Sequence, residues 1–274
     1  MKVTVDTKSK IKLFLSVPYR MTLALTGVNP MDIWKNCLGL SAYIRDWFAY
    51  NQTNPPRDSF NIKLAHLHPR LGDRYHDAGI ANGDYFHQDL WVAQKIFAAN
   101  PQEHWDVGSR IDGFVAHLLT FRTVNVIDIR KLESKVPGLI FHQGDVTALE
   151  IPDDSIESLS CLHAMEHVGL GRYGDPIDSW GYFKGMQELQ RILALGGRLY
   201  FSVPIGKERV EFNAHRVFNP LTVTEAFSSL SLIAFAAINE TGDLIDPARP
   251  EDFKTVRSAC GLFVFEKLAK SSKE

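Results

Sequence analysis

The sequence predicts an α/β fold with a doubly wound, mostly parallel sheet and an antiparallel strand pair at its C-terminal edge. From residue 103 onward, short apolar runs alternate with amphipathic stretches. The first run ends in a turn at Asp106 and Gly108, and the second run, 124–127, ends in Asp128. Two late apolar runs, separated by a polar insertion at 240–258, are expected to pair as a hairpin. In such sheets ligands bind at the carboxyl ends of the strands, so the pattern also predicts where a site lies.

Each predicted strand is an apolar run between turn-forming or polar residues, and the predicted helix at 178–194 has an apolar face formed by Tyr182, Met186, Leu189 and Leu193. The predicted strands are 104–107, 124–128, 138–142, 156–162, 197–203, 231–238 and 261–268. The predicted helices are 111–121, 130–135, 178–194 and 221–230. Gly196 and Gly197 are expected to end the helix at 178–194, because glycine favours the position after a helix.

Residues 1–100 are expected to form an extension or cap, mostly helical and loop, ahead of a Rossmann-like domain at 101–270. Within it, 32–50 is apolar enough for a buried helix, and 85–99 has apolar residues at helical spacing. The apolar run 13–15 is short, whereas a signal peptide needs roughly 7–15 apolar residues and a membrane helix about 20. No membrane association and a cytoplasmic location are therefore expected.

The composition excludes several classes of function. With 45% hydrophobic residues over 274 positions the chain can bury a core, and its 30 basic and 32 acidic residues leave no excess of positive charge for nucleic acid. Its cysteines, Cys37, Cys161 and Cys260, are scattered and form no C-x-x-C pair. They predict neither a disulfide framework nor a metal site, and they fit a reducing compartment.

The motifs, in their order, resemble those of the class I S-adenosylmethionine-dependent methyltransferases. The segment 106–113 stands where that family has its glycine-rich loop, and Asp128 stands where the family's acid binds ribose, 20 residues after Gly108. The segment 144–156 resembles the adenine-contacting acid and the loop that leads into strand four, and 191–200 resembles the helix end, double glycine and fifth strand. The resemblance implies S-adenosylmethionine as cofactor, bound by Asp106, Gly108, Ser109, Arg110, Asp128, Asp145 and Val146.

The loop departs from the family pattern at two glycines. The family has acid-x-Gly-x-Gly-x-Gly, but here Arg110 and Asp112 replace the second and third glycines, and Gly113 comes one place late. Those glycines let the backbone approach the cofactor closely. A second hypothesis is therefore a non-catalytic Rossmann-like binding module with a degenerate loop. Phe114 and Val115 replace the residues that a P-loop needs, which argues against triphosphate binding, and the broken glycine pattern argues against a nicotinamide dehydrogenase.

Two segments, 107–117 and 169–176, more narrowly resemble an uncharacterised methyltransferase-like family with a VGSRIDGF loop. Bacterial members of that family often lie near surface-polysaccharide genes, which implies a small-molecule or sugar (glycan) acceptor for O- or N-methyl transfer and a role in polysaccharide biosynthesis. The candidate substrate-binding residues are Arg172, Tyr173, Asp175 and His215.

The segment 163–167 gives two further hypotheses. It reads His-x-x-Glu-His, the inverted zinc-peptidase motif, so a zinc hydrolase is a third reading. That chemistry needs both histidines on one long helix, whereas here a strand precedes the segment and glycines follow it. In a methyltransferase, a hydroxyl acceptor benefits from a base that titrates near pH 7, as histidine does. His163 is the candidate catalytic base, and Glu166 the candidate that orients it.

Overall fold

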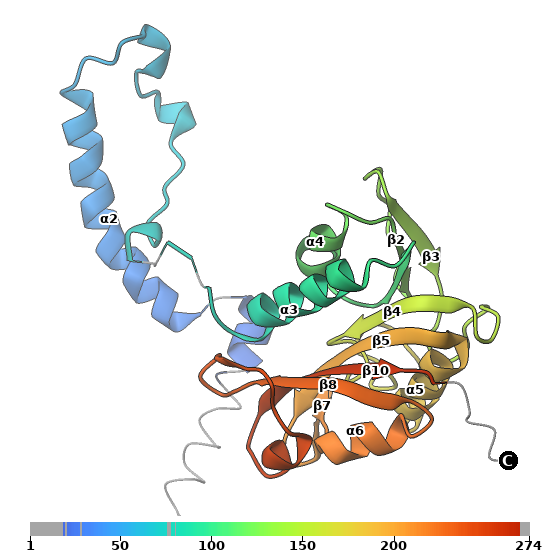
Figure 1. The fold of residues 1–274 in the computed structure, drawn as a ribbon. Coiled ribbons are helices and arrows are strands. Elements are labelled where there is room, and N and C mark those ends of the chain that lie inside the picture. Colours follow the sequence, from blue (N-terminus) through green and yellow to red (C-terminus); the bar gives the residue numbers. More distant parts are fainter. Residues whose placement is uncertain (1–18, 20, 28, 76–77, 80, 269–274) are drawn as a thin grey trace, which may run out of the picture. The chain divides into compact units, whose positions relative to one another are not determined.

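The chain folds as two compact units, residues 1–79 and 80–274 (Figure 1). The computed structural model describes residues 19, 21–27, 29–75, 78–79 and 81–268. The apolar run 13–15 lies outside the described residues. The division falls at 79/80, earlier than the expected end of the extension at residue 100, because helix α3 (Asp84–Ala99) packs into the core of the second unit.

The first unit is built on α2 (Pro30–Asn51), which confirms the helix predicted at 32–50. Its predicted burial is wrong: 65% of Trp34 and 56% of Phe48 are exposed. The following segment contains the short helical turns η1 (Asp58–Phe60), η2 (Leu64–His66) and η3 (Asp73–Tyr75). It approaches α2 closely at Gly39, where a Cβ atom would lie 1.9 Å from the carbonyl oxygen of Leu71. Among the described residues, no helix is long and apolar enough to cross a membrane.

The second unit contains an eight-stranded sheet in the order β3-β2-β1-β4-β5-β10-β8-β9. Its strands are β1 (His104–Val107), β2 (Val124–Asp128), β3 (Leu139–Gln143), β4 (Ile156–Leu162), β5 (Leu193–Ile205), β8 (Ser231–Ile238), β9 (Leu244–Ile245) and β10 (Ala259–Glu266). The first five are parallel to one another, and β10 is antiparallel to both β5 and β8. The short edge strand β9 is antiparallel to β8. The mostly parallel sheet and the antiparallel pairing of the two late runs are confirmed.

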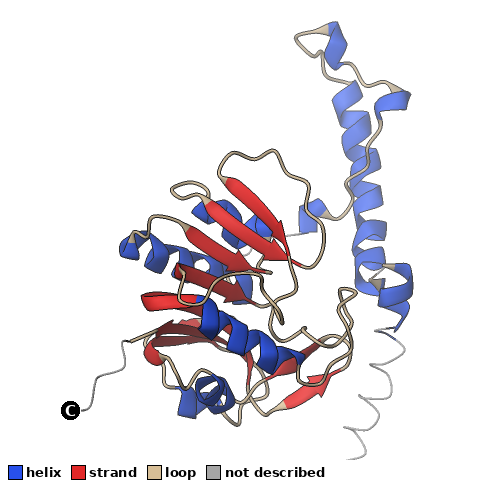
Figure 2. Cartoon of the chain, turned by 90° about the vertical axis from the view of Figure 1, so that its right-hand side faces the viewer, coloured by secondary structure: helices blue, strands red, loops and turns tan. Residues whose placement is uncertain are grey.

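Helices cover both faces of this sheet, as a doubly wound fold requires (Figure 2). On one face, α3 packs with η4 (Ile111–Val115) and α4 (Ala116–Leu118) around buried Ile96, Phe114 and Leu118. On the other, α5 (Gly181–Ile192) and α6 (Pro220–Ala226) pack around Met186 and Leu189. A separate hairpin pairs β6 (Arg209–Glu211) with β7 (His215–Val217), and η5 (Pro250–Phe253) lies in the polar insertion.

Several predicted helices differ in the structure. The predicted helix at 130–135 is wrong: the segment is a loop, in which the Asp128 carboxylate accepts the backbone N–H of Arg130. The predicted helix at 178–194 ends early, at Ile192, because buried Leu193 already pairs with Ile156 of β4. Gly196 and Gly197 therefore lie within β5 and not after the helix. The helix at 111–121 is only η4 and α4, and that at 221–230 is only α6.

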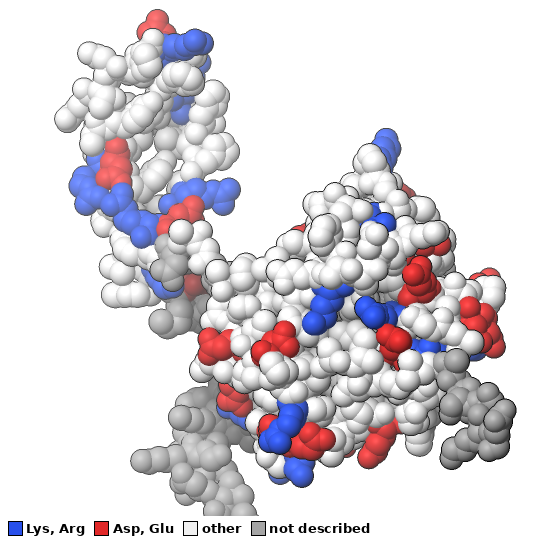
Figure 3. Space-filling model, in the orientation of Figure 1, with Lys and Arg blue, Asp and Glu red and all other residues white. Residues whose placement is uncertain are grey.

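Acidic and basic side chains alternate over the face of the second unit drawn in Figure 3. On that face the described residues form no continuous basic area.

The sheet topology places the carboxyl ends of β1 and β4 side by side, with the chain running outward in opposite directions from them. This is the switch point at which doubly wound sheets bind ligands.

Candidate functional site

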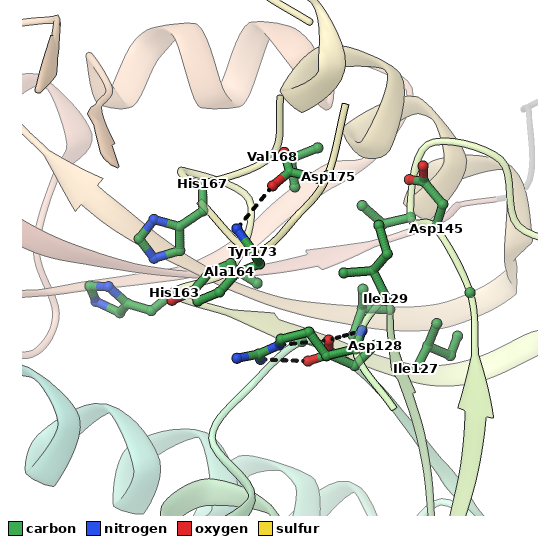
Figure 4. Close-up of a pocket in the computed structure, with 15 residues that line it drawn as sticks. Ile127, Asp128, Ile129, Asp145, His163, Ala164, His167, Val168, Tyr173 and Asp175 are labelled. Carbon is green, nitrogen blue, oxygen red and sulfur yellow. Dashed lines mark hydrogen bonds and ion pairs between the residues drawn. The ribbon is translucent and has the colours of Figure 1, made fainter. Parts of the chain in front are cut away.

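A cavity of about 610 Å³, including the part that opens to solvent, lies at this switch point (Figure 4). It collects residues from the ends of β1, β2 and β4, from the loop after β3 and from the loop at 168–175. In the view of Figure 4, the rings of His163 and His167 lie together on one side and Asp145 on the other. The cavity is lined by Val107, Gly108, Ile127, Asp128, Ile129, Arg130, Gly144, Asp145, Val146, His163, Ala164, His167, Val168, Tyr173 and Asp175.

Gly108 ends β1 at the floor of the cavity and must be glycine for two reasons. Its φ of +70° is in the left-handed region that side chains disfavour. A Cβ atom would also lie 2.9 Å from the Cβ atom of Ala164, which follows β4. The first loop and the segment after β4 are therefore in close contact beneath the cavity.

Asp106 and Ser109 hold this loop in place and do not line the cavity. Asp106 is fully buried and accepts hydrogen bonds from the Ser109 hydroxyl at 2.6 Å and the Ser160 hydroxyl at 2.5 Å. Burial raises the pKa of Asp106 to about 6, although these hydrogen bonds oppose the shift. The Ser109 hydroxyl in turn accepts the backbone N–H of Leu162, which ties the loop to β4.

Arg110 is not among the residues that line the cavity. Its Nε donates to Asp112 at 3.3 Å, and its guanidinium lies 4.8 Å from the ring centre of Tyr85 on α3. Asp112 is 82% exposed. The two residues that replace the family's glycines therefore leave the cavity open.

Asp128 is the acid at the end of β2, and Arg130 covers it. The Arg130 Nε donates to Oδ1 at 3.0 Å and Nη2 donates to Oδ2 at 2.7 Å. The same guanidinium stacks on the ring of Tyr173 at 4.4 Å. The bond to Asp128 raises the pKa of Arg130, so its guanidinium is charged at all ordinary pH values. Both oxygens of the predicted ribose-binding acid are thus occupied by the protein itself.

Asp145 and Val146 follow β3 and line the far side of the cavity. The Asp145 Oδ1 accepts the backbone N–H and the hydroxyl of Thr147, both at 2.8 Å. This bond pattern is that of an Asx-turn, which fixes the loop. It leaves the carboxylate on the cavity wall.

His163 is held on both ring nitrogens. Its Nδ1 lies 2.9 Å from Glu166 Oε1, and its Nε2 lies 3.2 Å from the Sγ atom of Cys260 on β10. Burial lowers the pKa of His163, but Cys260 and Glu166 outweigh burial and raise it well above the ordinary value. Burial likewise opposes ionisation of Glu166, yet contact with His163 lowers its pKa. The two residues form a buried ion pair, and His163 has no free ring nitrogen.

His167 lines the cavity, and within the described residues only its Nδ1 makes hydrogen bonds. Its Nδ1 lies 2.7 Å from the carbonyl oxygen of Ala214, a distance that requires Nδ1 to carry a proton and donate it. The neutral ring then has its lone pair on Nε2, which lies 3.6 Å from Glu166. Burial lowers the pKa of His167 in spite of the nearby carboxylate, so the ring is neutral at pH 7.

The loop after His167 is organised by Asp175. Its carboxylate accepts backbone N–H groups from Gly169 at 2.7 Å, Gly171 at 3.2 Å and Tyr173 at 3.2 Å. Tyr173 and Asp175 line the cavity, whereas Arg172 donates to the Ala214 carbonyl and lies 5.1 Å from the centre of the Tyr173 ring.

Three further expected site residues, like Asp106, Ser109 and Arg110, do not line the cavity. Arg172 and Glu166 contact lining residues without lining the cavity themselves. His215 lies on β7, with Nε2 3.8 Å from Glu211.

The zinc-hydrolase reading fails on geometry. His163 and His167 stand on a turn, not on one face of a helix. The described residues contain no group of three or more His, Cys, Asp or Glu side chains that could hold a metal ion. His163 instead uses its nitrogens for Glu166 and Cys260.

Comparisons with known proteins give no substrate for this chain. Residues 148–255 match a family model described as Caenorhabditis protein of unknown function, DUF268. No curated protein matches the sequence. The YcgJ protein from Bacillus subtilis is 17% identical, with 67% of this chain and 99% of that chain covered and a TM-score of 0.46. An S-adenosylmethionine-dependent methyltransferase from Clostridium acetobutylicum is 11% identical, with 69% and 94% covered and a TM-score of 0.46.

The 1,6-didemethyltoxoflavin-N1-methyltransferase of Burkholderia thailandensis, solved with bound S-adenosylhomocysteine, is 12% identical. The match covers 66% of this chain and 79% of that enzyme's chain, with a TM-score of 0.47. At these identities and TM-scores the likenesses carry no conclusion about this chain's family or activity. The order of the sheet, with antiparallel β10 between β5 and β8, decides the fold class. The chain has a class I methyltransferase-like fold.

The sequence alone indicated neither Arg130 as a site residue nor His167 as a candidate base. Arg130 stood in a predicted helix, so its reach back to Asp128 was hidden. Its signal in the sequence is its place two residues after the acid. The tautomer of His167 depends on Ala214, 47 residues away, and no local pattern shows it.

Proposed function

We propose that this protein is an S-adenosylmethionine-dependent methyltransferase that acts on an oxygen or nitrogen atom of a small molecule or sugar, including glycans. One observation carries the proposal: Gly108, Asp128 and Asp145, three positions singled out by the family resemblance, line a single cavity at the switch point of the sheet. Cofactor sites commonly lie at this place in doubly wound folds.

The residues present fit the adenosyl cofactor. Gly108 leaves the floor of the cavity free of a side chain. Asp128 would accept the ribose hydroxyls once Arg130 releases it, and Asp145 with Val146 would hold the adenine end. Arg130 is more than half exposed, so its release needs no rearrangement of the core.

The bound cofactor would supply an activated methyl group, so the protein's task is mainly to position the acceptor in line with it. His167 lines the cavity with a neutral Nε2 lone pair and is better placed than His163 to take a proton from a hydroxyl acceptor. The ion pair of His163 and Glu166 would act as a fixed wall beneath it, held by Cys260.

A glycan or sugar acceptor, and with it a role in polysaccharide biosynthesis, rests on the narrower resemblance of the segments 107–117 and 169–176. In the structure the second segment supplies Tyr173 and Asp175 to the cavity. An aromatic ring beside a carboxylate and an arginine suits a sugar, whose hydroxyls and apolar faces it can contact.

The alternative is a non-catalytic binding module. The closed ion pair of Arg130 and Asp128 favours it, because a ligand that uses Asp128 must first displace Arg130. A module of this kind would bind without turnover.

Methyl transfer to a panel of acceptors, followed as formation of S-adenosylhomocysteine, separates the two. A methyltransferase should form it with at least one sugar or small-molecule acceptor and lose the reaction in Asp128→Asn. His167→Asn should lower kcat and remove the dependence of kcat on the pKa of this residue, with less effect on the KM for the cofactor. Binding without any formation of S-adenosylhomocysteine, in protein shown to be folded, would support the module.

A further inference from the structure

A second cavity lies on the other side of the segment 168–177, and a buried arginine forms part of its wall. It measures about 1030 Å³, including the part open to solvent, and lies between this segment, α5 and the β6–β7 hairpin. Val168, Tyr173 and Asp175 face the first cavity, whereas Gly169, Leu170 and Ile177 line the second. The two spaces therefore share a wall and are distinct.

Arg216 of β7 is the buried cation in this wall. Only 6% of its surface is exposed, yet no carboxylate among the described residues lies within ion-pair distance of it. Its Nη1 donates to the carbonyl oxygen of Val168 at 2.6 Å and weakly to that of Glu166 at 3.5 Å. Its guanidinium lies 5.0 Å from the ring centre of Tyr182. Buried charges are normally paired, so this arginine lacks its usual counterion.

The remaining donors of Arg216 face the open cavity. Its Nε and Nη2 have no acceptor in the described part of the chain, and neither belongs to the polar atoms that are fully enclosed without a partner. Together they form the edge of the guanidinium that receives carboxylate or phosphate oxygens side by side. Burial lowers the pKa of Arg216, while Tyr182, Asp175 and Asp178 oppose this shift. A bound anion would stabilise the charged guanidinium further.

Neighbouring charges do not supply that anion. Asp175 uses its carboxylate on three backbone N–H groups, and Asp178 is paired with Lys184 at 2.7 Å. Glu208 and Arg209 also line the cavity, with Arg209 bonded to Glu211 at 2.9 Å. The titratable groups that line the cavity thus have one more positive than negative charge.

Apolar side chains form the rest of the wall and are unusually exposed. Ile177, Val210 and Phe212 are 71%, 55% and 76% exposed, and all three line the cavity with Tyr182. Clustered exposed apolar side chains are typical of a surface that binds something. Their position around a buried cation points to a ligand that carries both an anionic and an apolar part.

We propose that this cavity binds an organic anion, a carboxylate or phosphate attached to an apolar or aromatic group, with the anion on Nε and Nη2 of Arg216 and the apolar part against Tyr182 and Phe212. The inference does not depend on methyl transfer. A charged hydrogen-bonded pair at such a site accounts for roughly tenfold or more in affinity.

Calorimetric titration with four probes tests this: phenyl phosphate, benzoate, inorganic phosphate and neutral benzyl alcohol. We expect phenyl phosphate or benzoate to bind at least tenfold more tightly than benzyl alcohol and than inorganic phosphate, and which of them is tighter identifies the preferred anion. Arg216→Met should lose this binding. Arg198→Met, which removes an arginine paired with Glu266 elsewhere on the surface, should keep it.

Arg216 also supports the segment 168–177 through Val168, so its variant could fail to fold. Ser179→Trp covers that case: Ser179 is an exposed residue on the rim, and a large side chain there fills the cavity without touching the core. Loss of phenyl phosphate and benzoate binding in Ser179→Trp supports the site. Unchanged binding in folded Arg216→Met or in Ser179→Trp, or equal affinity for benzyl alcohol, overturns it.

Discussion

Arg130 occupies both carboxylate oxygens of Asp128, with Nε 3.0 Å from Oδ1 and Nη2 2.7 Å from Oδ2. The acid that the family resemblance assigns to the cofactor ribose is therefore masked within the chain. Tyr173 holds the arginine from its other side, at 4.4 Å. This arrangement makes the affinity for any ligand of Asp128 depend on how readily Arg130 leaves.

Arg130→Ala should therefore increase the affinity for S-adenosylmethionine. A solvent-exposed ion pair contributes about 0–1 kcal/mol, so we expect binding up to about fivefold tighter, measured by calorimetry. Lys131→Ala is the matched control, because Lys131 is an exposed neighbour paired with Glu133 and removes the same charge. If Arg130→Ala bound S-adenosylmethionine more weakly and Lys131→Ala did not, the arginine would be a direct contact of the ligand.

Glu166→Gln should destabilise the fold. It leaves buried His163 without its counterion, and breaking a buried ion pair costs about 3–5 kcal/mol in the free energy of unfolding. Since the pKa of His163 is raised, the pair's contribution is complete below the unfolded pKa and is lost as pH rises through the folded pKa. Urea unfolding at several alkaline pH values should show this loss in the native protein and not in the variant.

Glu133→Gln is the control for that experiment, since Glu133 is 80% exposed. If Glu166→Gln lowered the free energy of unfolding no more than Glu133→Gln does, the buried ion pair would be refuted.

His104 should make the protein sensitive to acid. It is fully buried between Ser158 and Ser160, both 2.8 Å away, and burial lowers its pKa to about 3. Below pH 6.5 the unfolded chain binds a proton that the folded chain refuses, so stability falls as pH falls. One pKa unit corresponds to about 1.4 kcal/mol, which gives a loss of about 5 kcal/mol between pH 6.5 and pH 3.

In His104→Gln, the free energy of unfolding measured with urea should no longer fall in this way between pH 6.5 and pH 3. His117→Gln, at an exposed position, should keep the fall. Asp106 acts in the opposite sense: its pKa is raised to about 6, so its contribution falls as pH rises from about 4 to about 6. The difference between native protein and His104→Gln isolates the histidine. An identical slope in both would contradict the assignment.

Gly169→Ala and Gly174→Ala form a matched pair in the loop beside the cavity. Both glycines have positive φ, +80° and +83°. At Gly174 nothing lies within 4 Å of an added Cβ atom, so we expect only the conformational cost of roughly 1–2 kcal/mol. At Gly169 the Cβ atom would lie 1.9 Å from the carbonyl oxygen of Asp178, so Gly169→Ala should lower the free energy of unfolding much more than Gly174→Ala does. Equal decreases in Tm for the two variants would show that the backbone at Gly169 shifts to accommodate the added Cβ atom.

Much of the sheet could be predicted from the sequence because its strands are short apolar runs between turns. β1, β2, β4 and β8 have the predicted bounds. Helix ends were harder, since tertiary pairing overrides local preference: Leu193 joins the sheet opposite Ile156 although its spacing continues the apolar face of α5. The segment 130–135 is exposed except for half-buried Leu132, so it has little apolar surface to stabilise a helix, and it stays a loop.

The candidate site was predictable where a residue stands at the end of a strand, as Gly108, Asp128 and Asp145 do. Contacts between distant segments were not. Cys260 reaches His163 across 97 positions, and Ala214 sets the tautomer of His167. These contacts move the proposed base from His163 to His167, and nothing in the motif itself distinguishes the two.

The most direct test of the central claim is calorimetric titration of the purified protein with S-adenosylmethionine and S-adenosylhomocysteine, alongside Asp128→Ala. The account predicts micromolar binding of at least one ligand in the native protein and its loss in folded Asp128→Ala. Absence of binding to both ligands in native protein and in Arg130→Ala, or equal binding in Asp128→Ala, would contradict it.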